Sequence, residues 1–163
     1  MKILGIDPGF ARLGWGIIEN DNGKYFLISS GCFETEKSLG SGERLLSIYN
    51  LTCDKIKESQ PEAIALETLF YNTNAKTVIP VGEVRGIILL AAEQMNVPIY
   101  QYTPLQVKMA VSGYGRADKN QVQQMTKSIL KLQSIIKPDD AADAVAIALT
   151  HVFSVKLSRQ TNL

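Results

Sequence analysis

The sequence predicts an α/β fold in which a mixed five-stranded sheet is flanked by helices. The chain opens with three strand-like segments, two of them joined by a tight turn, and continues with helical and strand-like segments in alternation. A hairpin brings antiparallel pairing and β–α–β alternation brings parallel pairing, so one sheet holds both. Because 163 residues suffice for one full core, we expect a single domain over residues 1–154 and a short polar tail over 155–163.

The first part of the chain carries four predicted strands and one predicted helix. Residues 2–7 form an apolar run that ends at a Pro-Gly pair, as a buried strand does. Residues 13–19 and 25–33 flank an Asn-Asp-Asn-Gly turn, which predicts a hairpin. Residues 43–59 place apolar side chains at helical spacing, and a short strand over 62–67 follows a proline.

The second part of the chain alternates helix and strand. A long apolar helix is predicted from Lys76 to Met95, and a strand from Val97 to Tyr102 follows it. Glycine and proline then divide the remainder into three further helices, predicted over residues 104–112, 118–133 and 139–154.

Four acidic residues stand where these elements end or begin. Asp7 and Glu67 close two apolar strands, while Asp140 and Asp143 lie one turn apart at the start of the last helix. Ionised carboxylates beside a core are costly unless they are paired or bind a metal ion. Taken singly, Asp7 also suits a turn and Asp140 a helix cap. If the element ends converge, the oxygen-only pocket suits Mg²⁺, for which Mn²⁺ can substitute.

Helix capping explains Asp143 least well, because this residue lies beyond the helix start. Small side chains line the helix around it, and they let the helix lie close to a sheet. Such packing would bring both helix carboxylates to the strand ends. The small residues are Ala141, Ala142, Ala144, Ala146 and Ala148.

Basic residues gather between Leu105 and Lys137, although the whole chain has a formal net charge of only +1. The segment contains a single acid, Asp118. This local excess of positive charge fits a polyanion bound beside the acidic pocket, and it fits a solvated helix face equally well. The basic residues are Lys108, Arg116, Lys119, Lys127, Lys131 and Lys137.

Other features of the sequence exclude classes of protein. The chain has no stretch of eighteen apolar residues and no secretory signal pattern, so we expect a cytoplasmic protein without membrane contact. Cys32 and Cys53 lack metal-type spacing and are expected to be reduced thiols. The Asp7 loop also resembles the phosphate loop of actin-like kinases, but such a kinase needs a second lobe that this chain has no room for.

The four acids belong to short motifs distributed over roughly residues 1–153. The motifs are Ile6-Asp7-Pro8-Gly9 with Gly14, Glu67 followed by Phe70, Gln106-Val107-Lys108, Lys119-x-Gln121-Val122 and Asp140-Ala-Ala-Asp143-Ala. Together they resemble the RuvC family of Holliday junction resolvases. The resemblance implies an RNase H-like fold, a homodimer, Mg²⁺-dependent nicking of four-way DNA junctions and a complex with a branch-migration helicase.

In this resemblance Asp7, Glu67, Asp140 and Asp143 match the family's catalytic acids one for one. Two cations roughly 3.5–4 Å apart can serve the in-line hydrolysis of a phosphodiester. We expect Asp7 to bridge two such ions, Glu67 to hold one of them, and the two helix aspartates to hold the other.

Further residues are candidates for DNA contact. Lys108 and Lys119 match family lysines near the acids, and they either stabilise developing charge or simply face solvent. Phe70 matches the family's stacking aromatic, whereas the role of Tyr71 stays open. The remaining candidates for contact with the DNA backbone are Arg12, Arg85 and Arg116. An ion pair with an acid on the protein's own surface would explain Arg12 and Arg85 equally well.

The helix from Lys76 to Met95 is apolar on more than one stripe, which predicts a homodimer through this helix about a two-fold axis. Two other functions remain open. One is an RNase H-like nuclease that acts on RNA or RNA–DNA hybrids. The other is a non-catalytic junction-binding module, although clustered acids would not help a protein that only binds phosphates.

Overall fold

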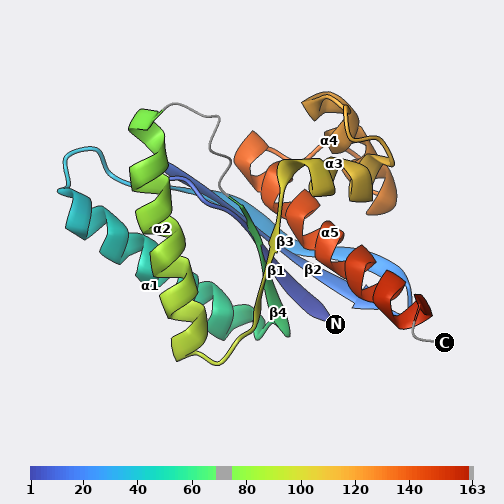
Figure 1. Cartoon of the computed structure of the whole chain (residues 1–163), viewed down its shortest axis with the longest axis horizontal. Helices are drawn as coiled ribbons and strands as arrows, with labels where there is room; N and C mark the ends of the chain where they lie inside the picture. Colours follow the sequence, from blue (N-terminus) through green and yellow to red (C-terminus); the bar gives the residue numbers. More distant parts are fainter. Residues whose placement is uncertain (69–74, 162–163) are drawn as a thin grey trace.

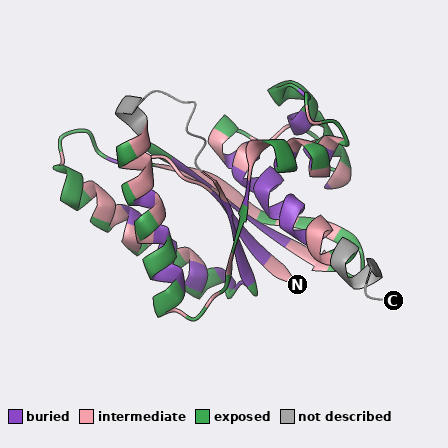
Figure 2. Ribbon diagram, viewed as in Figure 1, coloured by how far each residue is buried: buried purple, intermediate pink, exposed green. Residues whose placement is uncertain are grey.

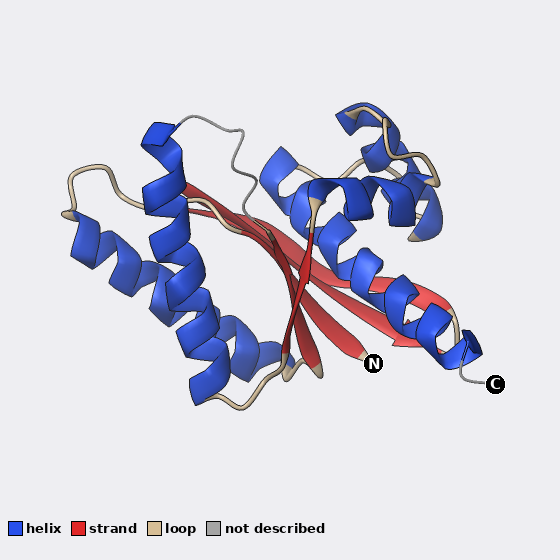
Figure 3. Cartoon of the chain, in the orientation of Figure 1, coloured by secondary structure: helices blue, strands red, loops and turns tan. Residues whose placement is uncertain are grey.

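The computed structural model describes the backbone of residues 1–68 and 75–161 and the side chains of residues 1–68 and 78–156. Its sheet has five strands in the order β3-β2-β1-β4-β5. The first three strands pair antiparallel, whereas β1 pairs parallel with β4 and β4 pairs parallel with β5. The predicted mixed sheet is therefore confirmed (Figure 3). The strands are β1 Lys2–Asp7, β2 Arg12–Asp21, β3 Lys24–Glu34, β4 Ala63–Glu67 and β5 Ile99–Tyr102.

Helices cover both faces of the sheet (Figure 1). Helices α1 and α2 lie together over one face, and α5 crosses the other face with α3 and α4 packed beside it. The helices are α1 Ser41–Ser59, α2 Ala75–Gln94, α3 Pro104–Ser112, α4 Lys119–Ile129 and α5 Asp139–Thr161. None of the helices in the described part of the chain is both long and apolar enough to cross a lipid bilayer.

The central strand β1 is buried on both faces because its side chains alternate between two cores. Ile3 belongs to the core cluster that includes residues of α3, α4 and α5, whereas Leu4 and Ile6 belong to the cluster that includes residues of α1 and α2. All three side chains are at most 1% exposed. Figure 2 shows the same division, with buried residues on the helix faces that turn toward the sheet. The continuous apolar run therefore predicted this buried strand correctly.

Helix α5 lies unusually close to the sheet, as its small side chains predicted. A Cβ atom on Gly5 of β1 would lie 2.0 Å from the carbonyl oxygen of Ala144, and one on Gly14 of β2 would lie 2.0 Å from that of Asp140. Neither strand position can hold a side chain unless the helix moves away. The start of α5, which bears Asp140 and Asp143, is thus seated on the end of the β1–β2 pair.

This close approach makes a testable prediction for Gly14→Ala. The added methyl group must push the α5 backbone outward, and overpacking of this kind costs about 1–3 kcal/mol of unfolding free energy. Gly42→Ala in α1 is the control, because a Cβ there meets nothing within 4 Å. We expect urea unfolding to show a lower midpoint for Gly14→Ala and an unchanged or higher midpoint for Gly42→Ala. Equal midpoints for Gly14→Ala and the parent would contradict the packing described.

Several element boundaries differ from the predicted ones. Helix α4 ends at Ile129 instead of residue 133, because Lys131 adopts a left-handed φ of 53° and the N–H of Leu132 bonds to the carbonyl of Lys127 at 2.9 Å. This is a Schellman-type ending with lysine where glycine is usual, so the sequence gave no signal. Strand β5 starts at Ile99, and α5 continues past residue 154 into the predicted tail.

Candidate active site

The fold brings the ends of two parallel strands and the start of α5 to one place. Asp7 and Glu67 are the last residues of β1 and β4, and the preceding residues Ile6 and Leu66 are paired in register. Their carboxylates therefore leave the sheet at the same edge. Because Asp7 also pairs with Gly14, on which the Asp140 backbone rests, the first turn of α5 lies beside both strand ends. The predicted convergence of the four acids is thus observed.

The electrostatics of these acids reflect their crowding. Burial, followed by the nearby Glu67, Asp143 and Asp140 carboxylates, raises the pKa of Asp7 to about 8. Burial and the charge of Asp143 raise the pKa of Glu67, although a hydrogen bond with Asp7 partly offsets this rise. Burial also raises the pKa of Asp143, against the opposing effect of Lys119. Without a bound cation, the site therefore resists full ionisation.

Two basic side chains already pair with Asp140 and Asp143 of α5. Lys119 Nζ lies 2.8 Å from Asp143 Oδ2 and 3.5 Å from Asp139 Oδ2. Burial lowers the pKa of Lys119, but these two carboxylates together outweigh it and keep the pKa above its ordinary value. Arg12 Nη2 lies 2.9 Å from Asp140 Oδ2. Arg12 therefore pairs with an acid of its own chain, and its contact with the DNA backbone remains a prediction.

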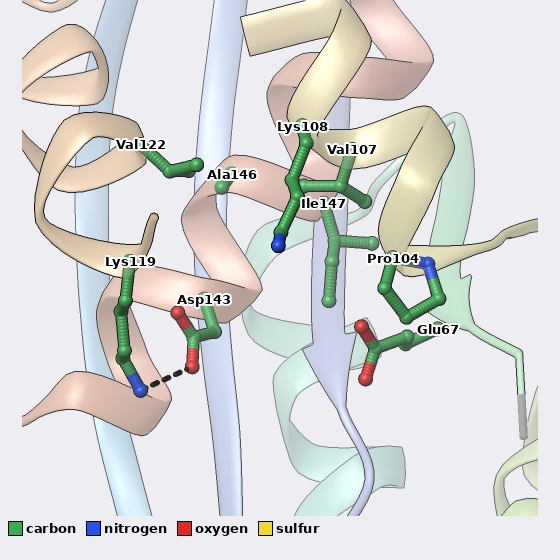
Figure 4. Close-up of a pocket in the computed structure, with 9 residues that line it drawn as sticks. All are labelled: Glu67, Pro104, Val107, Lys108, Lys119, Val122, Asp143, Ala146 and Ile147. Carbon is green, nitrogen blue, oxygen red and sulfur yellow. Dashed lines mark hydrogen bonds and ion pairs between the residues drawn. The ribbon is translucent and has the colours of Figure 1, made fainter. Parts of the chain in front are cut away.

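A pocket of about 210 Å³ opens beside the acids, between the end of β4 and helices α3, α4 and α5. Its polar lining consists of Glu67, Asp143, Lys108 and Lys119. Figure 4 shows Lys108 reaching from α3 into the space between Asp143 and Glu67, while Lys119 is drawn to Asp143 from the opposite side. In the described part of the chain, the Lys108 ammonium has no ion pair. The pocket thus holds two acids and one unpaired cation.

The oxygen-only donor set fits Mg²⁺, which prefers carboxylate ligands. In the regions that the structure describes, no three acidic, cysteine or histidine side chains are yet gathered as they would be around one ion. Asp143 is instead paired with Lys119. Metal binding would therefore require small side-chain movements, including release of Lys119 from Asp143.

Of the four other residues predicted to contact DNA, two lie in the described part of the chain and two do not. Arg85 of α2 donates to the backbone carbonyl of Glu67 and, at 2.6 Å, to Gln101 Oε1, so its guanidinium supports the ends of β4 and β5. Arg116 is exposed between α3 and α4. Phe70 and Tyr71 lie outside the described residues. DNA contacts by these four residues remain predictions.

Sequence patterns missed residues that support the acids without belonging to a motif. Asp139, which belongs to none of the motifs, accepts hydrogen bonds from Gln123 at 3.2 Å and Lys137 at 3.3 Å, and also faces Lys119. Cys32 and Glu34 on β3 approach the Asp140–Arg12 pair. Apart from Lys137, which is two residues from Asp139, no sequence spacing could have indicated these partners, since they come from elements other than α5.

Comparison with known proteins identifies the family. The family model of the crossover junction endodeoxyribonuclease RuvC matches residues 3–151, which is most of the chain. This chain belongs to the RuvC family. The RuvC of Desulfitobacterium hafniense is 53% identical over 157 residues, covering 96% of this chain and 95% of that protein.

Structural comparison agrees with the RuvC assignment. The Thermus thermophilus RuvC in complex with a Holliday junction substrate aligns with a TM-score of 0.92 and 35% identity, over 97% of this chain and 96% of that one. The yeast mitochondrial Holliday junction resolvase shares the fold, with a TM-score of 0.68 and 16% identity over 98% of this chain and 81% of that one. The expected RNase H-like fold is thereby confirmed.

Proposed function

We propose that this protein is a metal-dependent endonuclease that resolves four-way DNA junctions by paired, symmetric nicks. The observation that carries the proposal is the convergence of Asp7, Glu67, Asp140 and Asp143 in a chain of the RuvC family. Four-way junctions are the substrate named for the similar Thermus protein. The protein would act in the cytoplasm, where bacterial DNA lies.

In the proposed mechanism, Asp7, Glu67, Asp140 and Asp143 would together hold the Mg²⁺ ions. Bound cations would activate the attacking water and neutralise charge on the scissile phosphate. Lys108, directed into the pocket, is placed to donate to a phosphate oxygen as charge develops there. Lys119, once released from Asp143, becomes a second phosphate-facing donor. Asp139 keeps it near the site in the meantime.

Contacts outside the acids would select and hold the junction. We propose that Phe70 stacks on an unpaired base near the junction centre and that Arg116 contacts the DNA backbone. Tyr71 and Arg85 are weaker candidates, the latter because its guanidinium is engaged with Glu67 and Gln101. A branch-migration helicase is the proposed partner in the cell, following the resemblance to the family.

We also propose a homodimer through α2. One stripe of this helix, including Val84 and Ile88, is fully buried against its own sheet. A second stripe is exposed, with Ile79 at 71%, Leu89 at 39% and Leu90 at 58%. An isologous contact of two such stripes would cover these side chains and set two active sites about a two-fold axis. A junction with near two-fold symmetry suits that arrangement.

Leu90→Glu tests the dimer. A charge buried without a partner costs on the order of 3 kcal/mol, so we expect the dimer to dissociate about 100-fold more readily. Paired nicking should be lost, while the thermal unfolding midpoint changes little because Leu90 is exposed within its own chain. Ile28→Glu on β3, which adds the same charge at another exposed apolar site, should remain dimeric in light scattering. A wild-type protein that is monomeric both alone and on DNA would refute the dimer.

The proposed activity can be separated from its alternatives by one gel assay. Purified protein with Mg²⁺ is offered a synthetic four-way junction, a linear duplex and an RNA–DNA hybrid. We expect symmetric nicks in the junction alone. Cleavage of the hybrid in preference to the junction would indicate an RNA-directed nuclease. Tight junction binding without any cleavage, in Mg²⁺ or Mn²⁺, would indicate a non-catalytic binding module.

The raised pKa of Asp7 predicts how the metal-free protein responds to pH. With a pKa of about 8 in the folded protein and about 4 in the unfolded chain, Asp7 keeps its proton only when folded over the range between. Stability in a chelator should therefore fall as pH rises from about 4 to about 8, by at most about 1.4 kcal/mol per pH unit from this group. Urea unfolding at several pH values, repeated with Asp7→Asn, measures this slope. An identical slope in both proteins would contradict it.

A further inference from the structure

One oxygen of the Asp140 carboxylate is held by side chains from the neighbouring strands. Arg12 Nη2 lies 2.9 Å from Oδ2, and the Cys32 thiol donates to the same oxygen with Sγ at 3.8 Å. Arg12 in turn directs Nε toward Glu34 Oε1 at 3.5 Å. The other oxygen of Asp140, Oδ1, has no hydrogen bond or ion pair with any residue that the structure describes.

The sheet register builds this arrangement. Arg12 pairs with Glu34 and Gly14 pairs with Cys32 across β2 and β3. Because Gly14 has no side chain, the backbone of Asp140 rests directly on β2, and the Asp140 carboxylate therefore lies at the end of the β2–β3 pair. Two nitrogens of one planar guanidinium face two carboxylates, which fixes the plane of the Arg12 side chain as well as its position.

We propose that Arg12 is a positioning residue for the metal site, which fixes Asp140 through Oδ2 and thereby leaves Oδ1 available to a divalent cation. This inference rests on the proposed metal site. An aspartate in the first turn of a helix otherwise samples several rotamers, and a ligand that must be ordered on binding costs affinity. Partners that orient metal-binding carboxylates act in this way in other metal sites.

A positive charge near the site also has an opposing effect, because it repels a cation. Two features weaken that repulsion here. Glu34 lies against the same guanidinium, and the Arg12 side chain is 46% exposed, so solvent screens its charge. Orientation therefore outweighs repulsion, and removal of Arg12 should weaken metal binding.

The test measures Mn²⁺ binding to the full chain by electron paramagnetic resonance, apart from any cleavage. We expect Arg12→Gln to bind Mn²⁺ about 10-fold more weakly than the wild type. Lys24→Gln is the matched control, since it removes the same charge from the far end of the β2–β3 pair, where Lys24 pairs with Asp21. In nicking assays, Arg12→Gln should need about 10-fold more Mg²⁺ for half-maximal rate and approach the wild-type rate at saturation.

Two further variants make every outcome decisive. Glu34→Gln keeps Arg12 but removes the second carboxylate that fixes the plane of its guanidinium. We expect Glu34→Gln to weaken Mn²⁺ binding by a smaller factor than Arg12→Gln does. If Arg12→Gln does not fold, Glu34→Gln provides the test. Equal or tighter Mn²⁺ binding in the folded variants would overturn the role of Arg12. Asp7→Asn separates the two ideas: if it binds Mn²⁺ as the wild type does, the proposed metal site itself fails.

Discussion

Asp7→Asn should reduce nicking of a four-way junction by on the order of 1,000-fold, since metal activation supplies several kcal/mol to phosphodiester hydrolysis. Asp7 ends the central strand, and burial together with the charges of Glu67, Asp143 and Asp140 raises its pKa to about 8. Asparagine keeps the shape of the side chain but removes the charge that two cations would share.

The same substitution should leave junction binding intact or tighten it. Removing one negative charge lessens repulsion of the phosphate backbone, and the fold should be more stable at pH 8 in a chelator because no buried carboxyl remains to ionise. Nicking rates and gel-shift affinities are measured on the same preparation. Asp54→Asn, which changes an exposed acid of α1, is the control and should behave as the wild type. Nicking by Asp7→Asn at a rate near wild type would eliminate Asp7 as a metal ligand.

Lys108→Ala should lower the single-turnover nicking rate about 100- to 1,000-fold, the usual effect of losing one donor aimed at developing charge. The ammonium enters the pocket between Glu67 and Asp143 without an ion pair in the described residues, so its loss should cost little stability. Junction affinity should change far less than the rate, because one phosphate contact contributes little to a large electrostatic interface.

Lys127→Ala is the matched control for Lys108, since Lys127 belongs to the same basic segment but lies at the end of α4, away from the pocket. Single-turnover rates at saturating protein separate chemistry from binding. If Lys108→Ala keeps the wild-type rate, as Lys127→Ala should, Lys108 does not assist the reaction. If Lys108→Ala loses affinity alone, Lys108 contacts DNA without assisting the reaction.

The acids and the sheet could be read from the sequence because they depend on local rules. Apolar runs that stop at Pro-Gly or at an acid mark the ends of β1 and β4, and parallel pairing brings such ends together. The alanines of α5 predicted that this helix lies close to the sheet. The two apolar stripes of α2 predicted that its own sheet leaves one apolar face of the helix uncovered. Each of these signals lies within one segment or follows from the order of segments.

The neighbours of the acids depended on tertiary structure. Lys119 pairs with Asp143 across 24 positions of sequence, and Cys32 reaches Asp140 across 108. The left-handed ending of α4 likewise depends on a lysine that the core contact of Leu132 holds in an uncommon conformation.

The sequence by itself thus indicated the four acids proposed for the chemistry and the elements that bear them, because periodicity and strand ends are local properties. The tertiary structure alone decided which cation faces which acid. Those pairs are set by the register of β2 against β3 and by the packing of α5 on Gly5 and Gly14. A shift of one residue in either would bring different side chains together.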